Sequence, residues 1–103
     1  MNIQSMLKQA QALQAKMSKV QEELKSKELV GTAGGGKVKV TMNGAQEVTA
    51  ISIDPEVVKA EEADLLEDLV LAAFRDARSK ITKMVEEEMS RVTGGMGLPS
   101  GLL

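Results

Sequence analysis

Cysteine and histidine are both absent from this chain of 103 residues, and Phe74 is its only aromatic residue. Without these side chains the sequence offers no disulfide, no thiolate zinc site and no imidazole general base. Ser and Cys hydrolase triads completed by His are excluded for the same reason. We therefore expect no catalytic residue, no metal, no cofactor and no small-molecule substrate, and a core of aliphatic side chains.

Long apolar segments and a secretory leader are also missing. Uninterrupted apolar runs such as Leu69–Phe74 are far shorter than the roughly 18 residues that cross a bilayer. The N-terminus shows neither the charged and apolar regions nor the small-residue cleavage site of a signal peptide. The sequence predicts a cytoplasmic protein with no membrane partner, and its length favours one domain.

Charge is nearly balanced but unevenly distributed. The 13 basic and 15 acidic residues give a net charge of −2. Residues 1–27 carry five Lys against two Glu, further cations lie in residues 75–83, and the acidic excess lies in residues 56–68. This separation predicts a dipolar surface with two basic segments.

A helical seam occupies the N-terminal segment. Apolar residues recur there at alternating spacings of three and four: Ile3, Met6, Ala10, Leu13, Met17, Val20 and Leu24. This is the a/d pattern of a heptad, and no Gly or Pro interrupts it before Gly31. It predicts a helix of about 25 residues and about 37 Å. A helix of that length extends beyond a core of this size, so we expect a second chain to cover part of the seam.

The middle of the chain changes to a period of two. Residues 37–42 alternate polar and apolar, residues 45–53 are rich in Val, Thr and Ile, and Asn43-Gly44 between them is typical of a type I′ hairpin. With residues 28–33 they predict a three-stranded antiparallel sheet. Glu47 fits the apolar face poorly: either it lies at an exposed end of the hairpin or a bulge shifts the register. Two free strand edges would need covering, and pairing with a second copy is one solution.

The C-terminal half predicts a second long helix. Asp54-Pro55-Glu56 is typical of a helix start, and apolar residues recur at helical spacing from Ala63 to Val92. We expect the helix to stop at Gly94-Gly95. The expected organisation is one α+β domain at residues 1–93 and a flexible, glycine-rich tail at residues 94–103.

Two patterns that could indicate chemistry have simpler explanations. Residues 31–37 match G-x-x-x-x-G-K, but Val38 stands where a phosphate-binding loop needs Ser or Thr, and an alternating strand follows instead of a helix. A glycine turn between strands is the better interpretation. The carboxylates of residues 61–68 have no His or Cys beside them and predict a solvated helix face.

The remaining candidate is a cationic surface on both helices. Lysines on the first helix occupy outer heptad positions, and cations on the second helix are spaced three apart. Solubilising charge alone would explain these residues too. The candidate contacts with an anionic partner are Lys8, Lys19, Lys25, Arg75, Arg78, Lys80 and Lys83.

Five segments, in order, resemble the YbaB/EbfC family of bacterial nucleoid-associated proteins over essentially the whole chain. They are residues 6–17 (MLKQAQALQAKM), 38–45 (VKVTMNGA), 53–57 (IDPEV), 67–77 (EDLVLAAFRDA) and 94–101 (GGMGLPSG). The resemblance implies an α+β homodimer with a shared strand core and projecting helices like tweezers. It implies DNA binding without enzymatic activity.

Together these observations predict a homodimer in the nucleoid that binds double-stranded DNA mainly through the phosphate backbone, with low sequence specificity. We assign the dimer interface to the first helix and the apolar strand face, at Leu13, Met17, Val20, Val38, Val40 and Met42. The alternative is a dimeric scaffold that binds protein partners.

Overall fold

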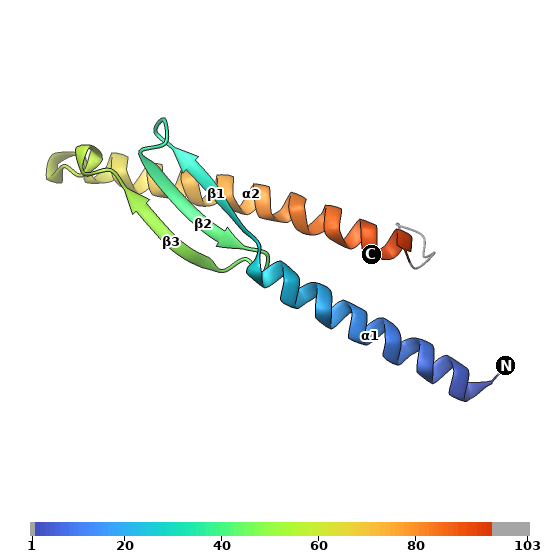
Figure 1. The fold of residues 1–103 in the computed structure, drawn as a ribbon. Coiled ribbons are helices and arrows are strands. Elements are labelled where there is room, and N and C mark those ends of the chain that lie inside the picture. The colour runs from blue at the N-terminus through green and yellow to red at the C-terminus, as the bar shows by residue number, and fades with distance from the viewer. Residues whose placement is uncertain (1, 96–103) are drawn as a thin grey trace.

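One long helix projects from the end of a three-stranded sheet, and a second long helix lies across one face of that sheet (Figure 1). The computed structural model describes residues 2–95. The elements are α1 (Ile3–Ser26), β1 (Glu28–Ala33), β2 (Val38–Asn43), β3 (Val48–Ile53) and α2 (Ala63–Gly95), with single 3-10 turns at Pro55–Val57 and Ala60–Glu62. The predicted α+β class and element order are confirmed. The molecule extends 70 × 21 × 16 Å, so it is strongly elongated.

Helix α1 projects because few of its side chains have a partner in this chain. Its N-terminus is capped by Asn2, whose side-chain oxygen accepts a hydrogen bond from the Gln4 amide at 3.0 Å. Along the seam only Leu24, near the C-terminal end, is buried, whereas Ile3 is 72% exposed. The predicted helix is therefore correct in length, but most of its apolar stripe is uncovered.

The first hairpin confirms the glycine turn. Strands β1 and β2 pair antiparallel from Glu28↔Asn43 to Ala33↔Val38. The glycines at 34, 35 and 36 all have positive φ, which L side chains rarely adopt. Lys37 is the last residue of the turn, since β2 begins one residue later than expected, at Val38, and its ammonium group bonds a Glu56 carboxylate oxygen at 2.9 Å. This bond raises the pKa of Lys37 above its usual value.

The second hairpin differs from the predicted two-residue turn. Asn43 ends β2 and its side-chain oxygen accepts from the Ala45 and Glu47 amides at 2.9 and 3.1 Å, which makes a longer loop. Gln46, not Gly44, has a positive φ of 62°. The register shifts beside Thr41 and Met42, so Val48 pairs with Met42. Both alternatives for Glu47 hold: the register shifts by a bulge, and Glu47 lies exposed at the end of the hairpin, just before β3.

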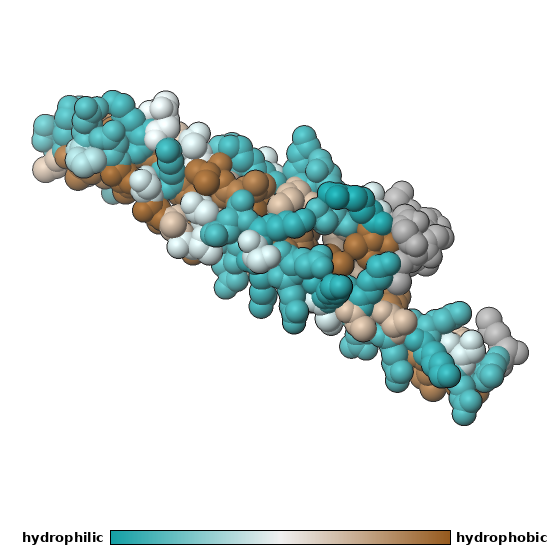
Figure 2. All heavy atoms as spheres, viewed as in Figure 1, coloured by the Kyte–Doolittle hydropathy of each residue, from teal (hydrophilic) through white to brown (hydrophobic). Residues whose placement is uncertain are grey.

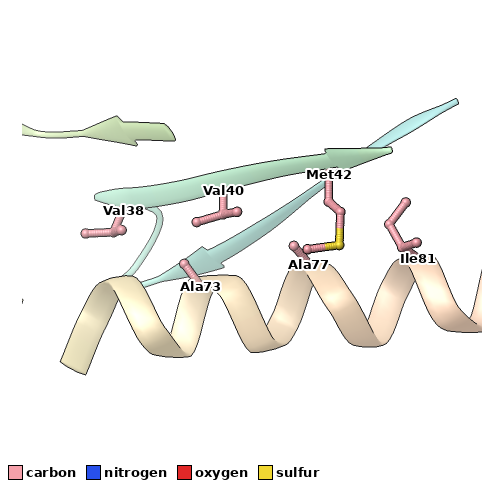
Figure 3. Packing of buried hydrophobic residues seen from close by; sticks show 6 residues of the cluster. All are labelled: Val38, Val40, Met42, Ala73, Ala77 and Ile81. Carbon is pink, nitrogen blue, oxygen red and sulfur yellow. The ribbon is translucent and has the colours of Figure 1, made fainter. Parts of the chain in front are cut away.

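The core lies between the helix-facing side of β2 and one stripe of α2 (Figure 3). Its members are at most 1% exposed: Val38, Val40, Met42, Ala73, Ala77 and Ile81. Gly31 on β1 is buried as well, and α2 packs over β1 and β2. The side of β3 that faces the helix layer is left largely open, with Ile51 55% exposed.

The start of the second helical region follows the sequence closely. Asp54 caps the first 3-10 turn by accepting from the Glu56 amide at 2.9 Å, and Pro55 is its first residue. Helix α2 includes Gly94 and Gly95, and the rest of the predicted tail lies outside the described residues. Among residues 2–95, no helix combines the length and apolar character needed to cross a membrane.

Candidate nucleic-acid interface

The outward side of α2 gathers three of the predicted cations. A shallow depression there is lined by Arg75, Arg78, Ser79, Thr82, Lys83 and Glu86. These residues face away from the sheet, because the buried positions Ala73 and Ala77 lie on the opposite side of the helix. Arg75, Arg78 and Lys83 are exposed and make no ion pair within residues 2–95. They are therefore free to bind anionic groups, and the two hydroxyls add hydrogen-bond donors.

Lys80 points elsewhere, although it belongs to the same predicted cluster. Its ammonium group donates to the Val30 carbonyl at 2.9 Å and lies 3.1 Å from the Asp76 carboxylate. Asp76 in turn accepts from the Thr32 amide at 2.9 Å. These hydrogen bonds occupy backbone groups on the free edge of β1. Lys80 therefore stabilises the packing of α2 on β1 and does not line the depression that holds Arg75 and Arg78.

The same contacts change the acidity of Asp76. The Thr32 amide, and next the ammonium group of Lys80, hold the pKa of the Asp76 carboxyl below its usual range. The ionised form is therefore favoured in the folded chain. We refer to Asp76 and Lys80 together as the edge cap, because they satisfy backbone groups that a further strand would otherwise pair with.

The lysines of α1 form a second cationic surface on the projecting helix. Lys8, Lys19 and Lys25 are all exposed and make no ion pair within the described residues. Lys8 and Lys19 are three turns apart on the side opposite the apolar seam, about 16 Å along the helix axis. In Figure 1, α1 and the second half of α2 extend toward the same end of the molecule. The α1 lysines and Lys83 therefore lie away from the acidic start of α2.

An apolar groove runs between β3 and the first half of α2. It has a volume of about 580 Å³ and is lined by Ile53, Ala63, Leu66, Glu67, Val70, Leu71 and Phe74. Figure 2 shows hydrophobic side chains gathered over this part of the molecule. Val48 and Ile51 extend the apolar surface along β3, at 41% and 55% exposure. This surface has the chemistry of a protein contact.

The residues predicted for the dimer interface fall into two groups. Val38, Val40 and Met42 are packed against α2 of their own chain and are at most 1% exposed. They are not available to a second chain in this structure, because α2 covers them. Leu13, Met17 and Val20 on α1 are half-buried.

Sequence reasoning missed the edge cap and the groove. Asp76 and Lys80 have the i, i+4 spacing of a helical ion pair, so the sequence could have predicted this pair. The groove could be anticipated in part, because Leu66, Val70 and Phe74 recur every four residues beside the stripe that holds Ala73 and Ala77. What the spacing could not show is that α2 leaves the β3 side uncovered.

Comparison with known proteins agrees with this architecture. The model of the YbaB/EbfC DNA-binding family matches residues 1–96. A nucleoid-associated protein of Rhodospirillum rubrum is 48% identical over 101 residues, which cover 98% of this chain and 94% of the relative. One from Caldanaerobacter subterraneus is 47% identical over 98 residues, covering 95% and 88%.

A solved structure shares the fold. The crystal structure of an uncharacterized protein from Helicobacter pylori superposes with a TM-score of 0.72 at 23% sequence identity, covering 93% of this chain and 97% of that one. Since the family model spans all of the described residues, and the relatives match along nearly their full length, the chain belongs to the YbaB/EbfC DNA-binding family.

Proposed function

We propose that this protein is a nucleoid-associated homodimer that binds double-stranded DNA through the phosphate backbone with low sequence specificity. The observation that carries the proposal is a pair of cationic helix surfaces that make no ion pair in the part of the chain that the structure describes: Lys8, Lys19 and Lys25 on α1, and Arg75, Arg78 and Lys83 on α2. Membership of a DNA-binding family supports the same partner.

Backbone contact is the mode that these side chains favour. Arg and Lys neutralise phosphates and release counterions, which gives affinity without reading bases. The guanidinium of Arg75 or Arg78 can grip a phosphate with two parallel hydrogen bonds, which a Lys ammonium cannot do. Phe74, the one aromatic residue, lines the apolar groove and is not on the cationic face, so base stacking does not contribute.

A homodimer follows from the two unequal sheet edges. The edge cap occupies backbone groups of β1, whereas within residues 2–95 β3 pairs only with β2 and its other edge is unpaired. The apolar groove and the exposed Ile51 lie beside this open edge. A second copy placed there would cover both the edge and the groove, and the two copies would contribute two sets of cationic surfaces.

The α1 seam is the second part of the proposed interface. Leu13, Met17 and Val20 have no partner helix among the described residues, and a helix of a second copy would bury them. Val38, Val40 and Met42 support the interface indirectly, because they hold β2 and thereby β3 in place. In the cell such a dimer would be found in the cytoplasm, on the nucleoid.

Equilibrium binding to several unrelated duplexes of equal length tests the proposal. Fluorescence anisotropy at increasing salt should give similar affinities for all duplexes, with log K falling linearly against log salt concentration. Light scattering on the same samples should give the mass of a dimer. No binding to any duplex at low salt would refute DNA binding, and a large preference for one duplex would refute low specificity.

The apolar groove favours one competing function, a scaffold that binds protein partners. Acidic residues precede and flank it at the start of α2, among them Glu67 in the groove lining itself. Such a surface repels DNA and accepts apolar protein segments. Tight binding of a protein at the groove, indifferent to salt, combined with absent DNA binding would favour the scaffold.

A further inference from the structure

The joint at the base of α1 decides where the cationic surface of that helix points. Helix α1 packs mainly against β2 in the described chain, and among its residues only Leu24 is buried. Within its own chain α1 is therefore held at one end, so the direction of this arm relative to α2 depends on a few contacts there, to which a second copy covering the seam would add. The contacts at its C-terminal end therefore control the separation between the α1 lysines and the cations of α2.

Gly44 forms the first of these contacts. Its amide lies 2.9 Å from the Leu24 carbonyl oxygen and 3.1 Å from that of Lys27, so the hairpin donates to the last turn of α1. A Cβ at position 44 would lie 2.4 Å from the Leu24 carbonyl oxygen and 2.7 Å from the Leu24 Cβ. Only glycine allows α1 to approach the hairpin this closely.

Glu88 forms the second contact, from α2. One carboxylate oxygen lies 2.9 Å from the Lys27 ammonium nitrogen and 2.8 Å from an Arg91 guanidinium nitrogen. The Glu88 side chain is 19% exposed, and the hydrogen bond from Lys27, together with the charge of Arg91, holds the pKa of Glu88 below its usual value. Lys27 immediately follows α1, so this bridge connects the base of the arm to α2.

We propose that Gly44 and Glu88 are positioning residues that fix the direction of α1, so that both cationic helix surfaces of a chain reach the same DNA duplex. This inference rests on the proposed DNA-binding function. It assigns a role to two residues outside the proposed cationic surfaces: Gly44, where there is no room for a side chain, and Glu88, whose carboxylate connects α2 to Lys27 at the end of α1.

The sign of the Glu88 effect separates positioning from plain electrostatics. Replacing Glu88 by Gln removes one negative charge, and by charge alone this would strengthen the attraction to DNA. Loss of the bridge leaves α1 free to move. Binding to DNA must then order this helix, and the lost conformational entropy weakens binding. Positioning and charge therefore predict opposite changes.

Glu87 provides a matched control one residue away. It is exposed and makes no hydrogen bond or ion pair in residues 2–95, so Glu87→Gln removes the same charge without touching the joint. We expect Glu88→Gln to weaken DNA binding threefold to fivefold and Glu87→Gln to leave it unchanged or slightly stronger. Circular dichroism should show both variants folded.

The arm itself can be measured without DNA, because the chain has no natural cysteine to interfere with labelling. Spin labels at Gln11→Cys on α1 and Ser90→Cys on α2, diluted with unlabelled protein, report the distance between the helices by pulsed electron paramagnetic resonance. The distribution should broaden in Glu88→Gln and shift in Gly44→Ala, while Glu87→Gln matches the parent.

The combined outcomes are decisive. A distance distribution that is the same in Glu88→Gln and the parent, or DNA binding by Glu88→Gln as tight as by Glu87→Gln, overturns the positioning role. If the parent binds no duplex at low salt, the proposed function fails instead, and the distance measurement alone then decides whether Glu88 holds the arm. If Gly44→Ala does not fold, the comparison of Glu88→Gln with Glu87→Gln still decides whether Glu88 positions α1.

Discussion

Gly31 on β1 lies directly against Ala77 on α2. A Cβ added to Gly31 would lie 2.2 Å from the Ala77 amide nitrogen and 2.3 Å from the Ala73 carbonyl oxygen. Both obstacles are backbone atoms, which cannot rotate aside as a side chain can. The close packing of α2 on the sheet therefore depends on three small residues that meet across the layer.

Gly31→Ala should destabilise the protein by about 3 kcal/mol or more, at or beyond the upper end of ordinary overpacking, because the helix must move away from the sheet. Urea unfolding followed by circular dichroism measures the change. The control is Gly35→Asn: space around Gly35 is open and Asn tolerates positive φ, so its effect should be small. Equal stability of Gly31→Ala and the parent would contradict this packing.

The proposed dimer surface makes a prediction about two residues that pair across β2 and β3. Val40 is 1% exposed and Ile51, its register partner, is 55% exposed. Val40→Asp buries a charge at a cost of several kcal/mol, against a total stability of about 5 to 15, so it should unfold the chain. Ile51→Asp should weaken or dissociate the dimer while leaving the secondary structure intact.

Sedimentation velocity at micromolar concentration, with circular dichroism on the same samples, measures both effects. A folded dimer of Ile51→Asp with the dissociation constant of the parent would show that the β3 surface is not the interface.

The edge cap predicts a specific acid sensitivity. The pKa of Asp76 is lowered in the folded chain, so its ionised form contributes stability above the unfolded pKa of about 4, and this contribution is lost as the pH falls below that value. Asp76→Asn should therefore reduce stability at pH 7 and flatten the loss of stability between about pH 4 and pH 2. Urea midpoints across this range measure it.

Asp68→Asn is the control for this experiment, since Asp68 is exposed and makes no hydrogen bond or ion pair in the described chain. The curve for this variant should keep the pH dependence of the parent. If Asp76→Asn also keeps that dependence, the edge cap does not stabilise β1.

Periodicity was sufficient to predict the elements of this fold because each is patterned over several turns or residues. The seam from Ile3 to Leu24 gives α1, and the alternation around Val38 and Val40 gives β2. The predicted two-residue turn of the second hairpin was wrong because of a tertiary contact. Gly44 is needed because α1 passes close to it, and a local turn rule does not include that contact.

The candidate site was less predictable, because partner choice depends on packing. Arg75 and Lys80 are both cations of α2, yet one faces outward and the other reaches the Val30 carbonyl of β1. Similarly, the apolar face of Val38 and Val40 could have met a second chain or α2, and it meets α2. Spacing along one segment identifies a face but not the element that covers it.

The central claim, that outward cations of α2 contact DNA phosphates, is tested most directly by the salt dependence of binding. Each phosphate contact contributes about 0.9 to the slope of log K against log salt. The double variant Arg75→Ala, Arg78→Ala should therefore weaken binding to all duplexes about equally and flatten the slope by about two units per chain that contacts the DNA. Its stability should stay within about 0.5 kcal/mol of the parent, since both residues are exposed.

Lys39→Ala with Lys59→Ala removes the same charge from the sheet and from the segment before α2, where both lysines are exposed. The measurement is the salt slope of these two double variants and the parent, determined side by side on one duplex. The account predicts a flattened slope for the arginine variant and the parent slope for the lysine variant. Parent slopes and affinities for both would contradict it.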